Sequence, residues 1–194
     1  MRLRFLLPLL ASLLLGACAK SPEWAMNDVT GHLPDLEFNL LGAGNQPVTA
    51  ADLRGKLVLM YFGYTHCPDI CPLSMTHLHQ ALVKLGPAAE QVRIVFISLD
   101  PARDTPALLQ AYARAFDPRA IGLTGPLKTV QKLAKRYRIG FSLGKPDQHG
   151  NYDVSHSSAV FVFDRDGRAR LLATSADNVD AVVHDLTLLL EQSP

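Results

Sequence analysis

The fold is decided by one stretch of the sequence, Tyr64-Thr65-His66-Cys67-Pro68-Asp69-Ile70-Cys71-Pro72, which directly follows the apolar run Leu57-Val58-Leu59-Met60-Tyr61-Phe62. The apolar run has the length and continuity of a strand that is buried on both faces. A helical pattern begins at the end of the quoted stretch. The two cysteines therefore stand where a buried strand ends and a helix begins, and there unpaired backbone N–H groups stabilise a thiolate.

A dithiol in this position is suited to three kinds of role. The thiolate is both the nucleophilic and the metal-binding form of cysteine, so Cys67 and Cys71 can exchange with disulfides or bind a soft metal. At a spacing of four residues the sulfurs can lie on one face of a first helical turn, close enough to form a disulfide or to hold one ion. A purely structural disulfide is the third alternative, because cysteines outside the cytosol are usually paired.

The rest of the chain alternates strand and helix patterns. Apolar runs of strand length recur at residues 92–99 and 159–163, and helical patterns cover residues 72–85, 105–116, 127–137 and 178–191. Residues 161–163 and 170–172 flank a turn and predict a closing hairpin, and residues 36–40 with a turn at 42–45 predict another near the N-terminus. This order predicts an α/β thioredoxin-like fold, a central mixed sheet flanked by helices, with an additional N-terminal hairpin.

The N-terminus predicts export from the cytoplasm. Arg2 and Arg4 precede an apolar run at residues 5–15, which is too short for an ordinary transmembrane helix and ends at small residues. Leu15-Gly16-Ala17-Cys18 is similar to the bacterial lipobox, in which the cysteine is lipidated and becomes the first mature residue. A plain signal peptide with an incidental Cys18 is the alternative.

These features divide the chain into three parts: a lipoprotein signal peptide at residues 1–17, a lipidated cysteine with a tether at residues 18–30, and one domain at residues 31–194. Loss of the signal peptide lowers the formal net charge from +1 to −1, because its charged residues are two arginines. A nearly neutral domain offers no general electrostatic basis for binding nucleic acid. We expect a lipid-anchored protein on the periplasmic face of a bacterial cell envelope, most plausibly at the inner membrane.

The number of available ligands restricts the metals that the site can bind. Structural zinc requires four ligands, whereas monovalent copper binds stably to two or three soft ones. A third ligand would most naturally be an imidazole. His156 directly precedes the predicted strand at residues 159–163, and in a thioredoxin-like sheet the loop entering that strand lies next to the dithiol turn. His156 can therefore complete a Cys2His site.

The other histidines have weaker claims. His77 and His79 are two residues apart in a predicted helix, so they point away from each other and we expect both at the surface. His66 adjoins Cys67 but faces the opposite way, which makes it a reserve candidate. His32, His149 and His184 belong to no motif.

Four segments together resemble the Sco/SenC copper chaperones of cytochrome c oxidase assembly, a family with a TxCPxxCP motif on a thioredoxin-like fold and a distant histidine. Residues 61–72 are similar to the family's copper loop, residues 97–106 to its second signature and residues 123–125 to its third. His156-Ser157 with residues 163–167 match the fourth. The resemblance covers most of the chain beyond residue 31.

The resemblance implies that Cys67, Cys71 and His156 bind one copper ion, Cu(I) or Cu(II), for delivery to the CuA centre of the oxidase. The implied protein is a chaperone and not an enzyme, and its partners are the CuA-bearing subunit and other periplasmic copper chaperones or thiol reductants. Many family members carry an acidic residue just before the histidine, where this chain has Ser155. An acid there can orient the imidazole, and the nearby Asp153 is a candidate substitute.

A second reading uses the same cysteines as a redox disulfide. In it the protein is a thiol–disulfide oxidoreductase that keeps the copper-ligand cysteines of the oxidase reduced, and this exchange has no need of His156. A peroxiredoxin fits less well, because its catalytic threonine lies three residues before the cysteine, whereas Thr65 lies two residues before Cys67.

Overall fold

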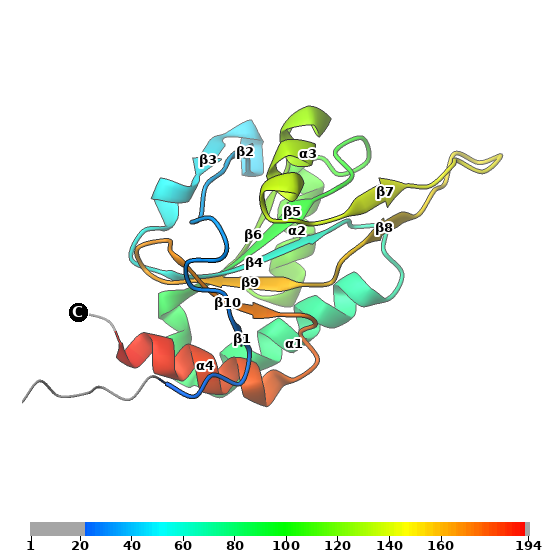
Figure 1. Ribbon diagram of the computed structural model, residues 1–194. Coiled ribbons are helices and arrows are strands. Elements are labelled where there is room, and N and C mark those ends of the chain that lie inside the picture. The colour runs from blue at the N-terminus through cyan, green and yellow to red at the C-terminus, as the bar shows by residue number, and fades with distance from the viewer. Residues whose placement is uncertain (1–21, 193–194) are drawn as a thin grey trace, which may run out of the picture.

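A six-stranded mixed sheet forms the centre of the molecule in the computed structural model, which describes residues 22–192 (Figure 1). The strands lie in the order β1-β10-β9-β4-β5-β6, with bounds β1 Asn27–Asp28, β4 Leu57–Gly63, β5 Val92–Ser98, β6 Ala120–Leu123, β9 Val160–Phe163 and β10 Ala169–Ala173. Strands β4, β5 and β6 are parallel, and β9 runs antiparallel to β4. Within the described residues, no helix combines the length and the apolar character needed to cross a membrane.

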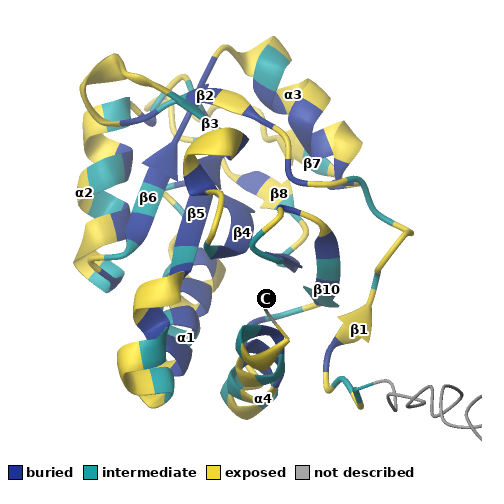
Figure 2. Cartoon of the chain, turned by 90° about the vertical axis from the view of Figure 1, so that its left-hand side faces the viewer, coloured by how far each residue is buried: buried dark blue, intermediate teal, exposed yellow. Residues whose placement is uncertain are grey.

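Helices cover both faces of this sheet. The described helices are α1 Ile70–Leu85, α2 Pro106–Phe116, α3 Leu127–Arg136 and α4 Val179–Glu191, with short 3-10 helices η1 Ala43–Asn45, η2 Ala50–Leu53 and η3 Gly86–Gln91. On one face α1 packs against both α2 and α4, and α3 covers the other face (Figures 1 and 2). This arrangement confirms the predicted thioredoxin-like fold, and each α-helix begins and ends within two residues of its predicted bounds.

Burial explains why these segments become strands and helices. All seven residues of β4 are buried, as expected for the central strand of a sheet that is covered on both faces (Figure 2). Helix α2 begins where the Thr105 hydroxyl accepts a hydrogen bond from the Leu108 N–H, and Asn178 caps α4 in the same way through the Ala181 N–H. Such caps satisfy N–H groups that have no partner inside the helix.

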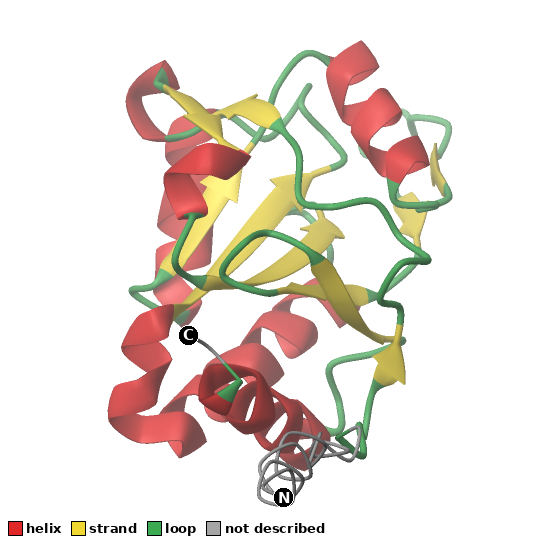
Figure 3. Ribbon diagram, turned by 60° about the vertical axis from the view of Figure 1, so that its left-hand side comes forward, coloured by secondary structure: helices red, strands yellow, loops and turns green. Residues whose placement is uncertain are grey.

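Two hairpins lie outside the central sheet (Figure 3). The predicted N-terminal hairpin is present as β2 Asn39–Leu41 and β3 Pro47–Thr49. The second hairpin, β7 Phe141–Leu143 and β8 Val154–His156, was not predicted. It forms a projecting arm whose connecting residues 144–151 are exposed (Figure 1).

The N-terminal segment is fastened to α4 by a buried carboxylate. The Ala25 N–H donates to both oxygens of Asp185, at 2.9 and 3.1 Å, and the Met26 N–H donates to one of them at 2.7 Å. Asp185 has no exposed surface. Directly afterwards β1 pairs with β10, so ordered structure begins before the domain boundary predicted at residue 31. The signal peptide and Cys18 lie outside the described residues.

Candidate metal centre

The dithiol lies at the carboxyl end of β4. Cys67 lies in the turn between β4 and α1, where it is half-buried, and Cys71 lies in the first turn of α1, where it has no exposed surface. Both thiols are free. The Cys71 N–H donates a hydrogen bond to the Cys67 sulfur at 3.5 Å, so the helix N-terminus contacts the more exposed thiol.

The two thiols differ in acidity. Burial raises the pKa of Cys71 to about 12. Burial also disfavours the Cys67 thiolate, but hydrogen bonds from the backbone of Asp69 and Cys71 outweigh this effect and lower the pKa of Cys67. Cys67 is therefore the nucleophilic sulfur at neutral pH, and Cys71 remains a protonated thiol.

The sheet register brings His156 to the dithiol. Because β9 runs antiparallel to β4, with Val160 opposite Tyr61, the residues that enter β9 lie beside the turn that leaves β4. His156 ends β8, and its Nε2 atom lies 3.4 Å from the Cys71 sulfur. The structure thus brings together these two predicted site residues, which are 85 positions apart in the sequence.

A backbone carbonyl fixes the orientation of the imidazole. His156 Nδ1 lies 2.8 Å from the Ser157 carbonyl oxygen, which can only accept, so Nδ1 carries the proton and Nε2 presents a lone pair to Cys71. Burial lowers the pKa of His156, which favours this neutral form. The Ser157 carbonyl therefore supplies the orienting hydrogen bond for which Asp153 was the predicted candidate, and Asp153 itself is exposed.

This geometry is suited to metal exchange for a proton. In the metal-free protein the protonated Cys71 thiol can donate to His156 Nε2. A soft metal would take the place of that proton between sulfur and nitrogen, because metal ligation requires thiolate and neutral imidazole. Cys67, in the turn between β4 and α1, lies next to this pair and can supply a further sulfur ligand.

Aromatic rings and a glycine form the walls of the site. The rings of Tyr61 and Tyr64 meet the imidazole of His156 edge-on, with centroids 6.2 and 6.1 Å away. A Cβ atom at Gly63 would lie 3.0 Å from the Cys71 sulfur and 2.8 Å from the ring of Phe96. Residue 63 therefore has to be glycine for the sulfur to pack against the end of β4. Sequence reasoning assigned no role to Gly63.

Two other histidines form hydrogen bonds with carboxylates and are not near the dithiol. His79 Nδ1 donates to the buried carboxylate of Asp117 at 2.9 Å, and His184 contacts Asp185 at 2.8 Å. His79 and His77 are both half-buried, so the prediction that they lie at the surface is only partly right. His66 is exposed and lies 3.1 Å from the Thr65 hydroxyl.

Across residues 22–192, no group of three or more His, Cys, Asp or Glu side chains is already gathered around a metal position. Cys71 and His156 are in contact, and the Cys67 sulfur instead accepts a backbone hydrogen bond. The Cys67 and Cys71 side chains also interact with each other. Cys71 therefore contacts both of the other predicted ligands, Cys67 and His156.

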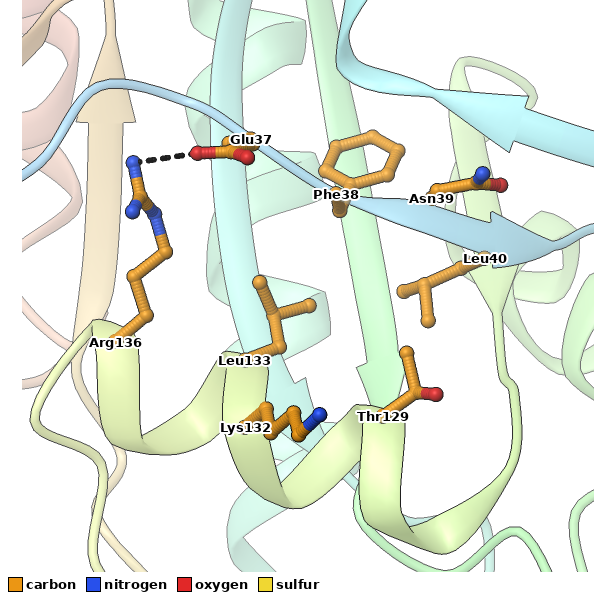
Figure 4. A pocket seen from close by; sticks show the side chains of 8 residues that line it. All are labelled: Glu37, Phe38, Asn39, Leu40, Thr129, Lys132, Leu133 and Arg136. Atoms are coloured by element: carbon orange, nitrogen blue, oxygen red, sulfur yellow. Dashed lines mark ion pairs between the residues drawn. The ribbon is translucent and has the colours of Figure 1, made fainter.

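One surface pocket lies apart from the predicted ligands. A pocket of about 280 Å³ lies between α3 and the chain that enters β2 (Figure 4). Glu37 and Arg136 form an ion pair of 2.8 Å at one end of it. The other lining residues are Phe38, Asn39, Leu40, Thr129, Lys132 and Leu133. None of the predicted ligands lines this pocket, so it is separate from the dithiol site.

A polar cluster beside the site was missed by sequence reasoning. Asp100 and Asp104 follow β5 and have no exposed surface, and Arg103 lies between them. The available signal was a pair of carboxylates four residues apart directly after a largely buried strand. Buried carboxylates are uncommon unless they are paired, so such a pair predicts specific partners.

Comparison with known proteins gives consistent relatives. The SCO1/SenC family model matches residues 30–191. The chain is 40% identical over 160 residues to the protein SCO2 homolog, mitochondrial, of Mus musculus, covering 79% of this chain and 63% of that protein, so it spans less than two thirds of the relative's length. The solved structure of Bradyrhizobium japonicum ScoI with copper bound has a TM-score of 0.72 and 35% identity, covering 80% of this chain and 98% of that chain. Arabidopsis thaliana ScoI with copper bound has a TM-score of 0.75 and 31% identity, covering 82% and 99%.

Proposed function

Because the chain belongs to the SCO1/SenC family, we propose that it is a copper-binding chaperone that delivers copper to the CuA centre of cytochrome c oxidase during assembly of that enzyme. In this proposal Cys67, Cys71 and His156 hold one copper ion. Two related ScoI structures contain copper, which supports the choice of metal. Copper is the cargo of the protein, and no step of the transfer requires a catalytic acid or base.

One observation carries the proposal: the 3.4 Å contact between the Cys71 sulfur and the unprotonated Nε2 of His156. Two thiolates alone suit Cu(I), and an added imidazole extends the site to Cu(II), which binds nitrogen ligands well. Such a set is too small for closed structural zinc, which requires four ligands. The donor set therefore favours a copper ion that can later be given away.

The different exposure of the cysteines suggests how copper leaves. Cys67 is half-exposed, so a thiolate or imidazole of a partner can approach the metal on that side. Cys71 and His156 hold the ion from the buried side until the partner supplies enough ligands. Transfer by stepwise ligand exchange needs low coordination and an open side, and this geometry has both.

We also propose that the domain acts at the periplasmic face of a bacterial membrane, anchored through a diacylated Cys18. A pair of acyl chains gives stable membrane binding, which one chain does not. Mass spectrometry of the mature N-terminus measures this modification directly. An unmodified terminus at another residue would contradict the anchor but leave the copper site unaffected.

The copper proposal is tested by titrating the reduced domain with Cu(I) and Cu(II). We expect one ion per chain in wild type and loss of binding in Cys67→Ser and Cys71→Ser. Asp117 and His79 form a half-buried pair away from the dithiol, so His79→Ala is a suitable control and should bind copper normally. Absence of copper binding by reduced wild type would overturn the proposal.

The acidity difference between the thiols favours a second candidate, a thiol–disulfide oxidoreductase that reduces the copper-ligand cysteines of the oxidase. A lowered pKa at the half-exposed Cys67 and a raised pKa at the buried Cys71 match an attacking and a resolving thiol. Rapid reduction of a disulfide-bonded peptide from the CuA subunit, with equal rates in wild type and His156→Ala, would favour this role over copper delivery.

A further inference from the structure

We infer that the turn at residues 100–104, between β5 and α2, is a positioning element that joins the two halves of the metal site. One end of the turn binds the arm that carries His156, and the other end binds the turn that carries Cys67. This inference rests on the proposed function and adds residues that act through the ligands without touching the metal.

At the Asp100 end, the turn binds the arm through Tyr152. Asp100 has no exposed surface, and it accepts hydrogen bonds from the Tyr152 hydroxyl at 2.6 Å and from Arg103 Nε. Arg103 Nη2 donates to the Tyr152 carbonyl at 2.9 Å, and its guanidinium lies 3.7 Å from the centre of the Tyr152 ring. Tyr152 is therefore held by its hydroxyl, its ring and its backbone, four residues before His156.

A second route runs through Tyr64. The Arg103 guanidinium lies 5.9 Å from the Tyr64 ring, and the same ring meets the imidazole of His156 edge-on. Tyr64 is buried, so it cannot move away without opening the site. Arg103 thus contacts aromatic groups on both sides of the imidazole, one from the arm and one from the dithiol turn.

The Asp104 end holds the approach to Cys67. Asp104 has no exposed surface, and it accepts hydrogen bonds from the Thr65 N–H at 3.1 Å, the Thr65 hydroxyl at 2.5 Å and the Ser98 hydroxyl at 2.6 Å. Thr65 lies two residues before Cys67. The turn itself is closed by backbone hydrogen bonds from the Arg103 and Asp104 N–H groups to the Asp100 carbonyl. Its two ends therefore move as one unit.

The arm needs such a support. Strands β7 and β8 pair with each other in a two-stranded sheet that is separate from the central sheet. A two-stranded hairpin by itself is marginally stable in water. The placement of His156 next to Cys71 therefore depends on the attachment of the arm to residues 100–104.

The other end of α2 provides a matched control. There Asp117, which also has no exposed surface, accepts hydrogen bonds from Arg119 Nε and Nη2, both at 2.7 Å. The side chains of Arg103 and Arg119 are 19% and 16% exposed, so both arginines pair with a buried carboxylate at similar depth. Only the first pair reaches the arm. A comparison of Arg103→Gln with Arg119→Gln separates positioning of the site from general stability.

We expect Arg103→Gln to lower Cu(II) affinity by about tenfold and to weaken the imidazole nitrogen couplings in the Cu(II) EPR spectrum. Cu(I) affinity, which depends on the two thiolates, should change by less than about twofold. Arg119→Gln should lower the thermal midpoint by a similar amount and leave copper affinity and the EPR spectrum unchanged. Normal Cu(II) affinity and nitrogen couplings in Arg103→Gln, or an equal loss in Arg119→Gln, would overturn the inference.

Amide hydrogen exchange of the metal-free protein tests the same inference without copper. Exchange at the β7–β8 hydrogen bonds should accelerate in Arg103→Gln and not in Arg119→Gln. Unchanged exchange at the β7–β8 hydrogen bonds of Arg103→Gln would contradict the inference. Faster exchange in that variant with unaltered Cu(II) affinity would contradict it as well. If wild type binds no copper, the proposed function fails while exchange still decides whether the turn positions the arm.

A milder pair serves if Arg103→Gln does not fold. Tyr152→Phe removes only the hydroxyl that bonds Asp100. Its control is Tyr112→Phe, because the Tyr112 hydroxyl is buried and has no hydrogen-bond partner among the described residues. Tyr152→Phe should reproduce the losses of Arg103→Gln in part, and Tyr112→Phe should show none. Equal behaviour of the two tyrosine variants would count against the inference.

Discussion

Cys67 in the turn after β4 and Cys71 in the first turn of α1 are only four positions apart, yet their surroundings give the two thiols opposite properties. In the turn, backbone N–H groups point at the sulfur, solvent reaches it and its pKa falls. On the helix, β4 and the aromatic rings enclose the sulfur and burial raises its pKa to about 12. The comparison teaches that a CxxxC motif need not contain two equivalent thiols. In this chain the Cys67 sulfur is the more reactive thiol, and the Cys71 sulfur is the buried and less acidic one.

Oxidation should abolish both the difference between the two thiols and the binding of copper. Joining Cys67 and Cys71 in a disulfide removes both thiolates, so copper uptake should be lost completely and restored by reductant. The measurement is bound copper per chain after mild oxidation and again after reduction. The reduced wild type is the reference. Equal copper binding by the oxidised protein would show that other residues form the site.

Thiol labelling should reveal the difference directly. With the pKa of Cys67 below its ordinary value of 9.0 and that of Cys71 at about 12, their thiolate fractions at pH 7 differ by at least about a thousandfold. Higher intrinsic nucleophilicity of the more basic sulfur offsets part of this, which leaves a difference in labelling rate of at least about thirtyfold before burial is counted. Iodoacetamide followed by peptide mass spectrometry measures both rates. As pH rises toward the Cys67 pKa, labelling of Cys67 should accelerate about tenfold per unit. Similar rates at the two cysteines would contradict the assigned asymmetry.

Removal of the His156 imidazole should weaken copper binding on the buried side of the site. His156→Ala should lower Cu(II) affinity by about tenfold or more and Cu(I) affinity much less, because the thiolates alone satisfy Cu(I). The Cys67/Cys71 reduction potential should stay nearly unchanged, and oxidase assembly in cells should fail unless copper is added. His66→Ala is the matched control, since that imidazole is exposed beside the same turn. Unchanged Cu(II) affinity in His156→Ala would remove this residue from the site and favour the oxidoreductase.

The smallest effect should come from crowding the buried sulfur. Gly63→Ala would place a methyl group 3.0 Å from the Cys71 sulfur, and such overpacking typically destabilises a protein by about 1–3 kcal/mol. Displacement of Cys71 should also bring its labelling rate closer to that of Cys67. Gly140→Ala is the control, because its added methyl group meets no atom within 4 Å and its φ is not positive. Urea denaturation measures both variants, and equal free energies of unfolding for them would argue against tight packing at Gly63.

The central sheet and helices were predictable because their signals are local. The strand at residues 57–62 is a continuous apolar run, and α2 has a capping threonine followed by proline at its first position. The arm escaped prediction because β7 and β8 have three residues each, are largely exposed and lack an apolar period. Strand β1 was missed because its two residues gain their structure from β10 and from the Asp185 contacts.

The proposed ligands could be named from the sequence, but their arrangement in space could not. Cys67 and Cys71 follow from their position, and His156 follows from the strand order together with the family resemblance. The Ser157 carbonyl that orients His156 carries no sequence signal, since every residue has such an oxygen. The role of Arg103 depends on Tyr152, which is 49 positions away, so only the folded chain brings them together.

If Cys18 carries the proposed lipid, the Asp185 contacts to Ala25 and Met26 would also limit how far the domain reaches from the membrane. Seven steps along the chain separate Cys18 from Ala25, a span of about 25 Å when fully extended. With the lipid on Cys18, the domain is confined to a thin layer of that depth, where its effective concentration toward other membrane-bound proteins is high. Acceptors whose copper ligands lie close to the bilayer are then met often, and acceptors that stand farther from it are not. Releasing the N-terminal segment from α4 would lengthen such a tether and widen this layer. In a lipid-anchored protein, the buried Asp185 side chain would thus influence which partners the proposed copper site can meet.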